Sequence, residues 1–277
     1  MSLSNEAIAI EKLFFIQDKD TGAKVPFILK PAQRFFDQEE GKRILIAKAR
    51  QLGFSSIIGA KFGIRCLGKF GTHAVVMSHE AGATQRLLDK VHFYLNHMKG
   101  PRPTFGRNSR NELYFPKTES SYYIGTAGSK AFGRGDWISD LHCSEYAWWE
   151  EPERHATGLF QAVPYSGRII IESTGNGRNN DFYYLWEHAD SMGYKRIFFP
   201  WFASLEYTLP LSPGKSWKPD LPKYNGQLID LQRKFNLKDI QMNWYEMKFK
   251  ELREDLKMIQ QEYPSEPEEC FQASGGQ

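Results

Sequence analysis

The chain has 277 residues, of which 41% are hydrophobic and 25% are charged, a balance typical of a globular protein and not of a disordered one. No apolar run approaches the roughly 18 consecutive residues of a membrane-spanning helix, and the N-terminus lacks the basic start of a signal peptide. Three dispersed cysteines (Cys66, Cys143 and Cys270) form no CxxC pair, which argues against a zinc site and predicts reduced thiols in a cytoplasmic setting.

The net charge is only +3, but it is unevenly distributed. Residues 1–130 carry 20 Lys and Arg against 11 Asp and Glu, whereas residues 131–277 carry 16 against 22. A basic half suits a polyanionic partner such as a nucleotide or a nucleic acid, but a solvated surface with scattered charge explains the same numbers. The charge alone therefore identifies no partner.

Strand-like and helix-like segments alternate along most of the chain. Apolar runs typical of strands occur at 43–48, at 72–78, twice within 111–124, from Trp137 to Cys143, at 168–174 and at 194–202. Helical patterns occupy 55–67, 80–98 and 182–189. Because glycine-containing loops join these segments, the pattern predicts an α/β domain with a largely parallel sheet.

The character of the sequence changes after Tyr207. Four prolines within 210–222 indicate a linker or an irregular excursion, and the charged stretch 226–262 has the pattern of two or three helices. We therefore expect a core over residues 1–207, followed over residues 208–277 by a linker and a small helical subdomain.

The junction between the strand at 43–48 and the next helix contains part of a phosphate-loop pattern. Backbone N–H groups and a helix N-terminus both face an anion at such a junction. Against the pattern GxxxxGK[ST], Gly53 and Ser55 occupy the second glycine and the hydroxyl position, but Phe54 replaces the lysine. Taken alone, the segment is more often an ordinary strand–helix turn.

A phosphate site in this loop requires a cation, because the charge on the β- and γ-phosphates must be neutralised as their bond breaks. Lys48, at the first-glycine position, or Arg50, in the middle of the loop, could supply that charge. Ser55 would then be the hydroxyl that coordinates a metal ion.

Three other segments support a nucleotide site. Gln33 precedes the loop, where several ATPases place a glutamine that reads adenine. Glu145 follows a predicted strand, and Ser173 to Asn176 follow the next one. Ligands of open α/β sheets collect at the C-terminal ends of strands, so we expect these segments to converge on one pocket.

In order and approximate spacing, these motifs resemble the ATPase motor domain of the large terminase subunits of tailed bacteriophages. The resemblance rests on the RQxG loop, the RG…SE-x-A strand end, STGNGRNNDFYYLW, FFPWFASLEY and QQEYPSEPEECFQASG, and covers about residues 27–275. It implies a P-loop fold of the RecA/ASCE-like class, with a mostly parallel sheet flanked by helices and a small helical C-terminal subdomain. It also implies that ATP hydrolysis with Mg²⁺ is coupled to translocation of double-stranded DNA into a procapsid.

The resemblance assigns a role to each matching residue. Arg50 corresponds to the loop arginine, Glu145 to the carboxylate that polarises the attacking water, and Arg134 to an arginine finger that some members insert into a neighbouring subunit's site. The segment that senses the γ-phosphate and couples hydrolysis to motion corresponds to Ser173, Thr174, Gly175 and Asn176. The expected ATP-binding set is Gln33, Lys48, Ala49, Arg50, Gln51, Leu52, Gly53, Phe54, Ser55 and Ser56.

Two positions depart from the family pattern. Ser144 stands where the family has an aspartate that holds magnesium through water, so the expected metal set is Ser55 and Ser144, with Asp140 or Glu172 as possible compensating charges. Phe54 replaces the loop lysine. Both changes predict a slow ATPase.

The resemblance also implies partners: double-stranded DNA, a portal ring and a small terminase subunit, in the cytoplasm of the host cell and outside the mature virion. We expect a homo-oligomeric ring when docked, a monomer in isolation and no contact with a membrane. The chain stops where the family's nuclease domain would begin, so we expect no nuclease site. Two alternatives stay open: a nucleic-acid-binding P-loop module with weak or no ATP turnover, and a helicase-like ATPase.

Overall fold

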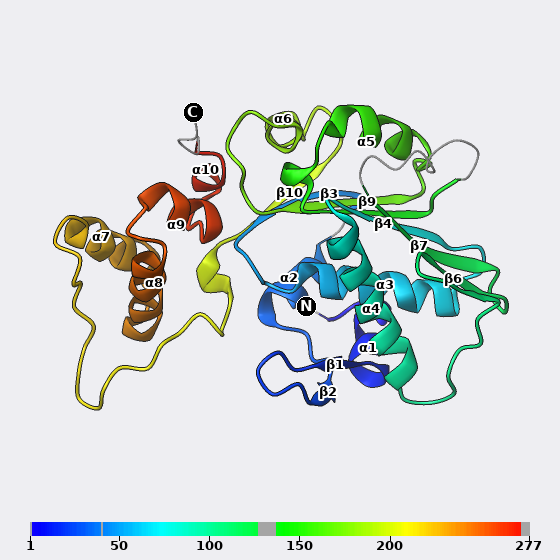
Figure 1. The fold of residues 1–277 in the computed structure, drawn as a ribbon, viewed down its shortest axis with the longest axis horizontal. Helices are drawn as coiled ribbons and strands as arrows, with labels where there is room; N and C mark the ends of the chain where they lie inside the picture. The colour runs from blue at the N-terminus through cyan, green and yellow to red at the C-terminus, as the bar shows by residue number, and fades with distance from the viewer. Residues whose placement is uncertain (1, 40, 127–136, 273–277) are drawn as a thin grey trace. The chain divides into compact units, whose positions relative to one another are not determined.

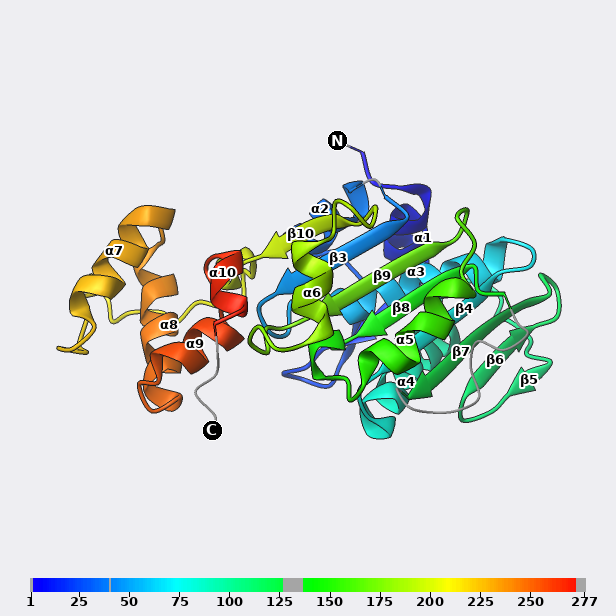
Figure 2. The same cartoon turned by 90° about the horizontal axis from the view of Figure 1, so that it is seen from above.

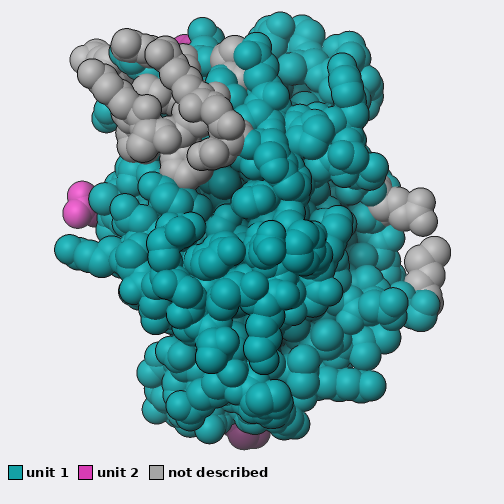
Figure 3. Space-filling model, turned by 90° about the vertical axis from the view of Figure 1, so that its right-hand side faces the viewer, with its two compact units in different colours: residues 1–47, 53–173, 180–197 teal, residues 48–52, 174–179, 198–277 magenta. Residues whose placement is uncertain are grey.

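The computed structural model describes residues 2–39, 41–126 and 137–272, with the backbone alone for residues 154–157. The chain forms two compact units, which Figure 3 distinguishes by colour. The first contains residues 1–47, 53–173 and 180–197, and the second contains residues 48–52, 174–179 and 198–277. Two short pieces of the second unit are thus excursions from the chain of the first.

Over the residues that the structure describes, the central sheet has eight strands in the order β10-β3-β9-β8-β4-β7-β6-β5 (Figure 2). The strands are β3 (Arg43–Lys48), β4 (His73–Ser78), β5 (Arg107–Asn108), β6 (Glu112–Phe115), β7 (Ser120–Thr126), β8 (Asp140–Ser144), β9 (Arg168–Ser173) and β10 (Lys195–Phe199). From β3 to β7 along the sheet, neighbouring strands are parallel, and β6 and β5 extend it as antiparallel strands. The predicted α/β class with a largely parallel sheet is confirmed.

Helices cover both faces of this sheet, and this explains its sequence pattern. Figure 1 shows α1 to α4 on one face and α5 and α6 on the other. These helices are α1 (Asn5–Leu13), α2 (Pro31–Gln38), α3 (Phe54–Gly68), α4 (Ala81–His97), α5 (Pro152–Gln161) and α6 (Asp181–Glu187). Every residue of β3, β4 and β9 after the first is buried, as expected for parallel strands enclosed on both sides.

Helices α3 and α4 pack closely because α3 carries glycine at the contact. A Cβ atom added to Gly59 would lie 3.3 Å from Cγ2 of Val91 and 3.4 Å from the hydroxyl of Tyr122. Val91 belongs to the apolar face of α4, whose buried residues recur at helical spacing: Thr84, Leu88, Val91, Tyr94 and Leu95. Glycine therefore lets the helix that begins after the loop lie directly against its neighbour.

The elements predicted over residues 43–98 and 111–124, the strands at 168–174 and 194–202 and the helix at 182–189 are confirmed to within a few residues. The expected run from Trp137 to Cys143 is β8, which begins only at Asp140. The sequence did not predict α1, α2, α5, β5 or the β1–β2 hairpin (Phe15–Gln17 and Lys24–Pro26). In α2 the reason is physical, because polar Gln33 and Asp37 are among its buried residues and hide the apolar period. Within the described residues, none of the helices combines the length and apolar character that a membrane crossing requires.

In the second unit, the described residues form an aromatic core and four α-helices. They are α7 (Asn225–Phe235), α8 (Asp239–Glu251), α9 (Leu256–Glu262) and α10 (Pro267–Cys270). The fully buried ring of Trp201 lies 4.9 Å from that of Tyr245 and 5.6 Å from that of Trp244, and Tyr207 stacks on Trp244 at 4.2 Å. Large planar side chains thus supply the apolar area that short helices alone would lack.

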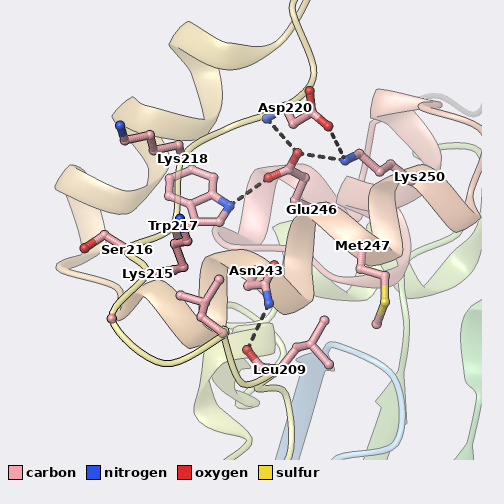
Figure 4. Close-up of a pocket in the computed structure, with 12 residues that line it drawn as sticks. Leu209, Lys215, Ser216, Trp217, Lys218, Asp220, Asn243, Glu246, Met247 and Lys250 are labelled. Atoms are coloured by element: carbon pink, nitrogen blue, oxygen red, sulfur yellow. Dashed lines mark hydrogen bonds and ion pairs between the residues drawn. The ribbon is translucent and has the colours of Figure 1, made fainter.

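The proline-rich segment of this unit is tied to α8 by a buried carboxylate (Figure 4). Glu246 accepts hydrogen bonds from the indole nitrogen of Trp217 at 2.7 Å and the backbone nitrogen of Asp220 at 2.8 Å, and it pairs with Lys250 at 3.1 Å. The segment and the helix line a hollow of about 770 Å³ that is open to solvent. The prolines therefore mark a segment without regular secondary structure, which is fixed at several points along α8.

Candidate active site

A buried carboxylate lies at the C-terminal ends of two central strands. Ser144, the last residue of β8, stands opposite Glu172 of β9 in the parallel register. The hydroxyl of Ser144 donates to Oε1 of Glu172 at 2.7 Å, and Nε2 of His142 lies 3.3 Å from the same oxygen. All three residues are at most 3% exposed.

The serine of the loop pattern reaches the same carboxylate. Ser55, in the first turn of α3, donates its hydroxyl to Oε1 of Glu172 at 2.8 Å. Oε1 of Glu172 thus accepts hydrogen bonds from the hydroxyls of both residues in the expected metal set, Ser55 and Ser144. Hydrogen bonding of this kind offsets the cost of burying a carboxyl group.

Asp140, the other acid considered as a compensating charge, lies at the opposite end of β8. It forms an ion pair of 3.0 Å with Arg65 and accepts a hydrogen bond of 2.8 Å from Ser139. Arg65 also pairs with Glu6 at 3.0 Å. Asp140 therefore belongs to a structural network that joins α1, α3 and the start of β8, and Glu172 is the acid beside the two serines.

Glu145 follows Ser144 with an unusual backbone conformation. Its φ of 52° and ψ of 47° are left-handed, a region that non-glycine residues rarely occupy, and the residue is half-buried. The turn is fixed on both sides: the backbone nitrogen of Ala147 donates to Oγ of Ser173 at 3.1 Å, and the indole of Trp149 donates to the carbonyl of Ser144 at 3.0 Å. Strain held in this way at a strand end is typical of functional positions.

Gln33 holds the start of α3. Gly53 caps this helix with a φ of 82°, and its carbonyl accepts a hydrogen bond of 2.8 Å from the Gln33 amide. The positive φ favours glycine here, and a Cβ atom at Gly53 would lie 2.8 Å from that amide nitrogen, so a larger residue would also displace the Gln33 side chain. Phe54 is 1% exposed and its ring meets that of Phe36 at 5.8 Å. The side chain at the usual lysine position is thus part of the core.

Residues 48–52 of the loop belong to the second unit and are held within it. The backbone nitrogen of Ala49 donates to the carbonyl of Phe199 at 3.0 Å, and that of Arg50 donates to the carbonyl of Glu262 at 3.1 Å. The guanidinium of Arg50 also forms a 3.0 Å ion pair with the Glu262 carboxylate. The hydroxyl of Tyr207 donates to the carbonyl of Arg50, and burial raises the pKa of Tyr207, which keeps it protonated.

Four further residues of the expected ATP-binding set lie in or beside this loop. Lys48 ends β3 and is buried, as is Leu52, whereas Gln51 is exposed and has a φ of 52°. Ser56, in the first turn of α3, accepts a hydrogen bond of 3.3 Å from Lys90.

The expected coupling segment leaves β9 and continues into the second unit. Ser173 ends β9, Thr174 and Gly175 are buried, and Asn176 is half-buried. A Cβ atom at Gly175 would overlap the carbonyl oxygen of Cys270 in α10. Close to it, Nε of Arg178 donates to the carbonyl of Phe271 at 3.1 Å. The backbone of this segment is therefore in direct contact with the C-terminal helices.

Arg134, the expected arginine finger, lies outside the described residues. Two residues of the site were not identified as such from the sequence. Glu172 entered only as an alternative, although an acid that ends the run RIIIE just before the polar triplet is a usable signal. Glu262, the partner of Arg50, has no local signal, because the two are far apart in the chain.

The donor set suits magnesium better than a transition metal. Among the described residues, no three His, Cys, Asp or Glu side chains are grouped so as to hold a metal ion by themselves. Mg²⁺ is usually bound through one or two protein oxygens, several waters and the phosphates of a substrate. The Ser55 hydroxyl and the Glu172 carboxylate offer oxygen donors of that kind.

Solved structures share this fold. The large terminase of bacteriophage HK97 matches with a TM-score of 0.57 and 13% identity, over 88% of this chain and 55% of its own. The large terminase of a thermophilic bacteriophage matches with a TM-score of 0.51 and 12% identity, over 77% and 48%. The ATPase domain of the Thermus phage P74-26 large terminase matches with a TM-score of 0.53 and 15% identity, over 86% and 99%.

This chain spans about half the length of the whole large terminases and nearly all of the isolated ATPase domain. No family model matches it, and no curated protein matches it in sequence. At these identities the likeness establishes the fold, which is that of terminase ATPase domains.

Proposed function

We propose that this chain is the ATPase motor domain of a DNA-packaging terminase, which couples ATP hydrolysis to translocation of double-stranded DNA into a procapsid. The observation that carries the proposal is that the hydroxyls of Ser55 and Ser144 both donate to one carboxylate oxygen of Glu172. In open α/β sheets, the C-terminal ends of the strands are where ligands bind, and the start of α3 adds backbone N–H groups suited to phosphate.

The residues divide the chemistry among them. When bound, Mg²⁺ supplies positive charge to the β- and γ-phosphates. The Ser55 hydroxyl would hold it, the Glu172 carboxylate would orient that hydroxyl, and Ser144 donates a hydrogen bond that keeps the carboxylate in place. Glu145 orients and deprotonates the attacking water, a role that needs a carboxylate in a fixed position.

The loop provides the remaining charge in this proposal. Phe54 is buried and brings no cation, so Arg50 and Lys48 are the candidates to pair with phosphate. Gln33 reads adenine in addition to holding Gly53. Arg134 acts as a finger in a neighbouring subunit's site, and Ser173 to Asn176 carry the signal of hydrolysis to the region 208–277, which serves as a lid or transmission subdomain.

The partners follow from the same proposal. They are double-stranded DNA, a portal ring on which copies of the chain assemble into a ring, and a small terminase subunit, all in the host cytoplasm. A second candidate function, nucleotide binding with little or no turnover in a nucleic-acid-binding module, is favoured by the hydroxyl at Ser144 and the phenyl ring at Phe54.

The test is ATP turnover with Mg²⁺, with and without double-stranded DNA, together with nucleotide binding, for the parent chain and Glu145→Gln. We expect the parent to hydrolyse ATP and the variant to bind nucleotide without hydrolysing it, because it loses the base but no phosphate contact. Binding without turnover in the parent, at every protein and DNA concentration, would favour the second function. Absence of nucleotide binding would contradict both.

A further inference from the structure

P-loop ATPases place a negative charge at the end of the strand that corresponds to β8. We propose that in this chain Glu172 supplies that charge from the neighbouring strand β9. It acts on a metal–nucleotide complex by orienting the hydroxyl of Ser55. This inference rests on the proposed nucleotide site and identifies a positioning residue within it.

The first argument is the geometry of the sheet. In P-loop enzymes, Mg²⁺ is held by the loop Ser or Thr together with an aspartate at a strand end. Here that strand end carries Ser144, and Glu172 stands directly opposite it in the parallel register. Neighbouring strands are about 4.8 Å apart, and glutamate is one methylene longer than aspartate, so an acid on β9 can extend its carboxylate toward the end of β8. The 2.7 Å hydrogen bond from Ser144 shows that it does.

The second argument is the direction of the hydroxyl hydrogens. A serine hydroxyl has one hydrogen and two lone pairs. Ser55 directs its hydrogen to Oε1 of Glu172 at 2.8 Å, which leaves its lone pairs for a cation. Carboxylates that accept hydrogen bonds from metal ligands in this way fix the ligand and increase its basicity. Glu172 therefore prepares Ser55 to act as a ligand.

The third argument is that the other acid of this strand pair is committed elsewhere. Asp140, at the opposite end of β8, is fully buried and paired with Arg65. The two acids thus form a matched pair for experiment: both are buried carboxylates at the ends of adjacent strands, but only Glu172 contacts Ser55.

The experiment measures binding of Mn²⁺, as a spectroscopic substitute for Mg²⁺, in the presence of a non-hydrolysable ATP analogue, by electron paramagnetic resonance or calorimetry. We expect Glu172→Gln to weaken Mn²⁺ binding about ten-fold or more. The affinity for the ATP analogue without metal, measured in the presence of a chelator, should stay unchanged. The control Asp140→Asn should lower thermal stability and leave Mn²⁺ binding at the parent value.

A charge-relocation variant separates the proposal from a merely structural role. Ser144→Asp in the Glu172→Gln background returns one carboxylate to the end of β8, and it should restore most of the lost Mn²⁺ affinity. If Glu172→Gln does not fold, Glu172→Asp replaces it, and we expect weaker Mn²⁺ binding because the carboxylate is withdrawn by one methylene.

The outcomes distinguish the two proposals. Parent-like Mn²⁺ affinity in folded Glu172→Gln or in Glu172→Asp overturns the role of Glu172 and leaves the proposed function intact. Failure of Ser144→Asp to restore any affinity also overturns it. If the parent protein binds no nucleotide with or without metal, the proposed function itself fails.

Discussion

Arg50, in the loop after β3, is paired twice with Glu262 at the end of α9: its guanidinium lies 3.0 Å from the carboxylate, and its backbone nitrogen donates to the Glu262 carbonyl at 3.1 Å. The proposed phosphate cation therefore already has a carboxylate partner within the second unit. A phosphate that binds Arg50 must compete with this carboxylate. The contact thus offers a route by which nucleotide binding alters the attachment of α9 to the loop.

Glu262→Gln is expected to increase nucleotide affinity, because it removes the competing charge and keeps the backbone hydrogen bond. The Arg50 side chain is 57% exposed, and exposed ion pairs are worth about 0.2–1 kcal/mol, so we expect an increase of up to about five-fold. Titration with a fluorescent ATP analogue measures it. The control is Glu266→Gln, which breaks a 2.6 Å surface pair with Lys234 and should leave affinity unchanged. Weaker binding by Glu262→Gln would show that the pair supports the loop instead.

Substitutions at Arg50 and Phe54 are expected to separate binding from folding. Arg50→Ala should strongly reduce nucleotide affinity or turnover, with a small effect on the free energy of unfolding because the side chain is exposed. Phe54→Ala should lower the free energy of unfolding by about 3–5 kcal/mol, because it empties a core position next to Phe36. Chemical denaturation and ATPase assays measure the two effects, with Phe54→Leu as the milder control that keeps an apolar side chain in the core. Parent-like hydrolysis by Arg50→Ala would refute the assignment of the cation.

Gly175→Ala is expected to disturb the contact between the coupling segment and α10, because the added methyl group would overlap the Cys270 carbonyl. Backbone cannot move aside as a flexible side chain can, so we expect faster amide hydrogen exchange in residues 267–272 and a lower free energy of unfolding. Gly226→Ala is the matched control in the same unit, because a Cβ atom there meets nothing within 4 Å. Its effect should be neutral or slightly stabilising, since alanine favours the helix. Equal exchange in both variants would show that the segment adapts to the methyl group.

Stability should decrease in acid partly through Asp37. Burial works against its charge, but hydrogen bonds from Lys61 and Ser4 prevail and lower the pKa of Asp37 below its ordinary value. A lowered pKa contributes stability that is fully present above the ordinary pKa, near 4, and is lost as the pH falls through the pKa of the folded state. Asp37→Asn should therefore cost about 1–3 kcal/mol at pH 7 and progressively less at lower pH. Urea denaturation at pH 7 and at a pH below the ordinary pKa of aspartate tests this. Asp190→Asn, in an exposed pair with Arg196, should change stability by less than about 0.5 kcal/mol at either pH.

Much of the fold follows from local sequence. The runs RILIAK, HAVVMS and RIIIES each contain consecutive apolar residues, as strands enclosed on both faces require, and the helical patterns between them make the parallel α/β sheet readable without a structure. The positions of Gly53 and Ser55 at the start of α3, of Glu145 after β8 and of Ser173 at the end of β9 are equally local, because each lies within a few residues of a recognisable boundary.

Tertiary structure alone shows that Glu172 meets the hydroxyls of Ser55 and Ser144, and it alone pairs Arg50 with Glu262. Both acids lie in buried strands, but the parallel register sets Glu172 opposite Ser144 and Asp140 opposite Arg168, so the two occupy opposite ends of the sheet. Arg50 and Glu262 are adjacent only because the chain beyond β10 returns to the loop through an aromatic core. Local sequence determines where a strand or a loop forms, because the period of apolar residues and the turn residues act over a few positions. Which charges meet depends on the path of the whole chain, since an ion pair requires only closeness in space.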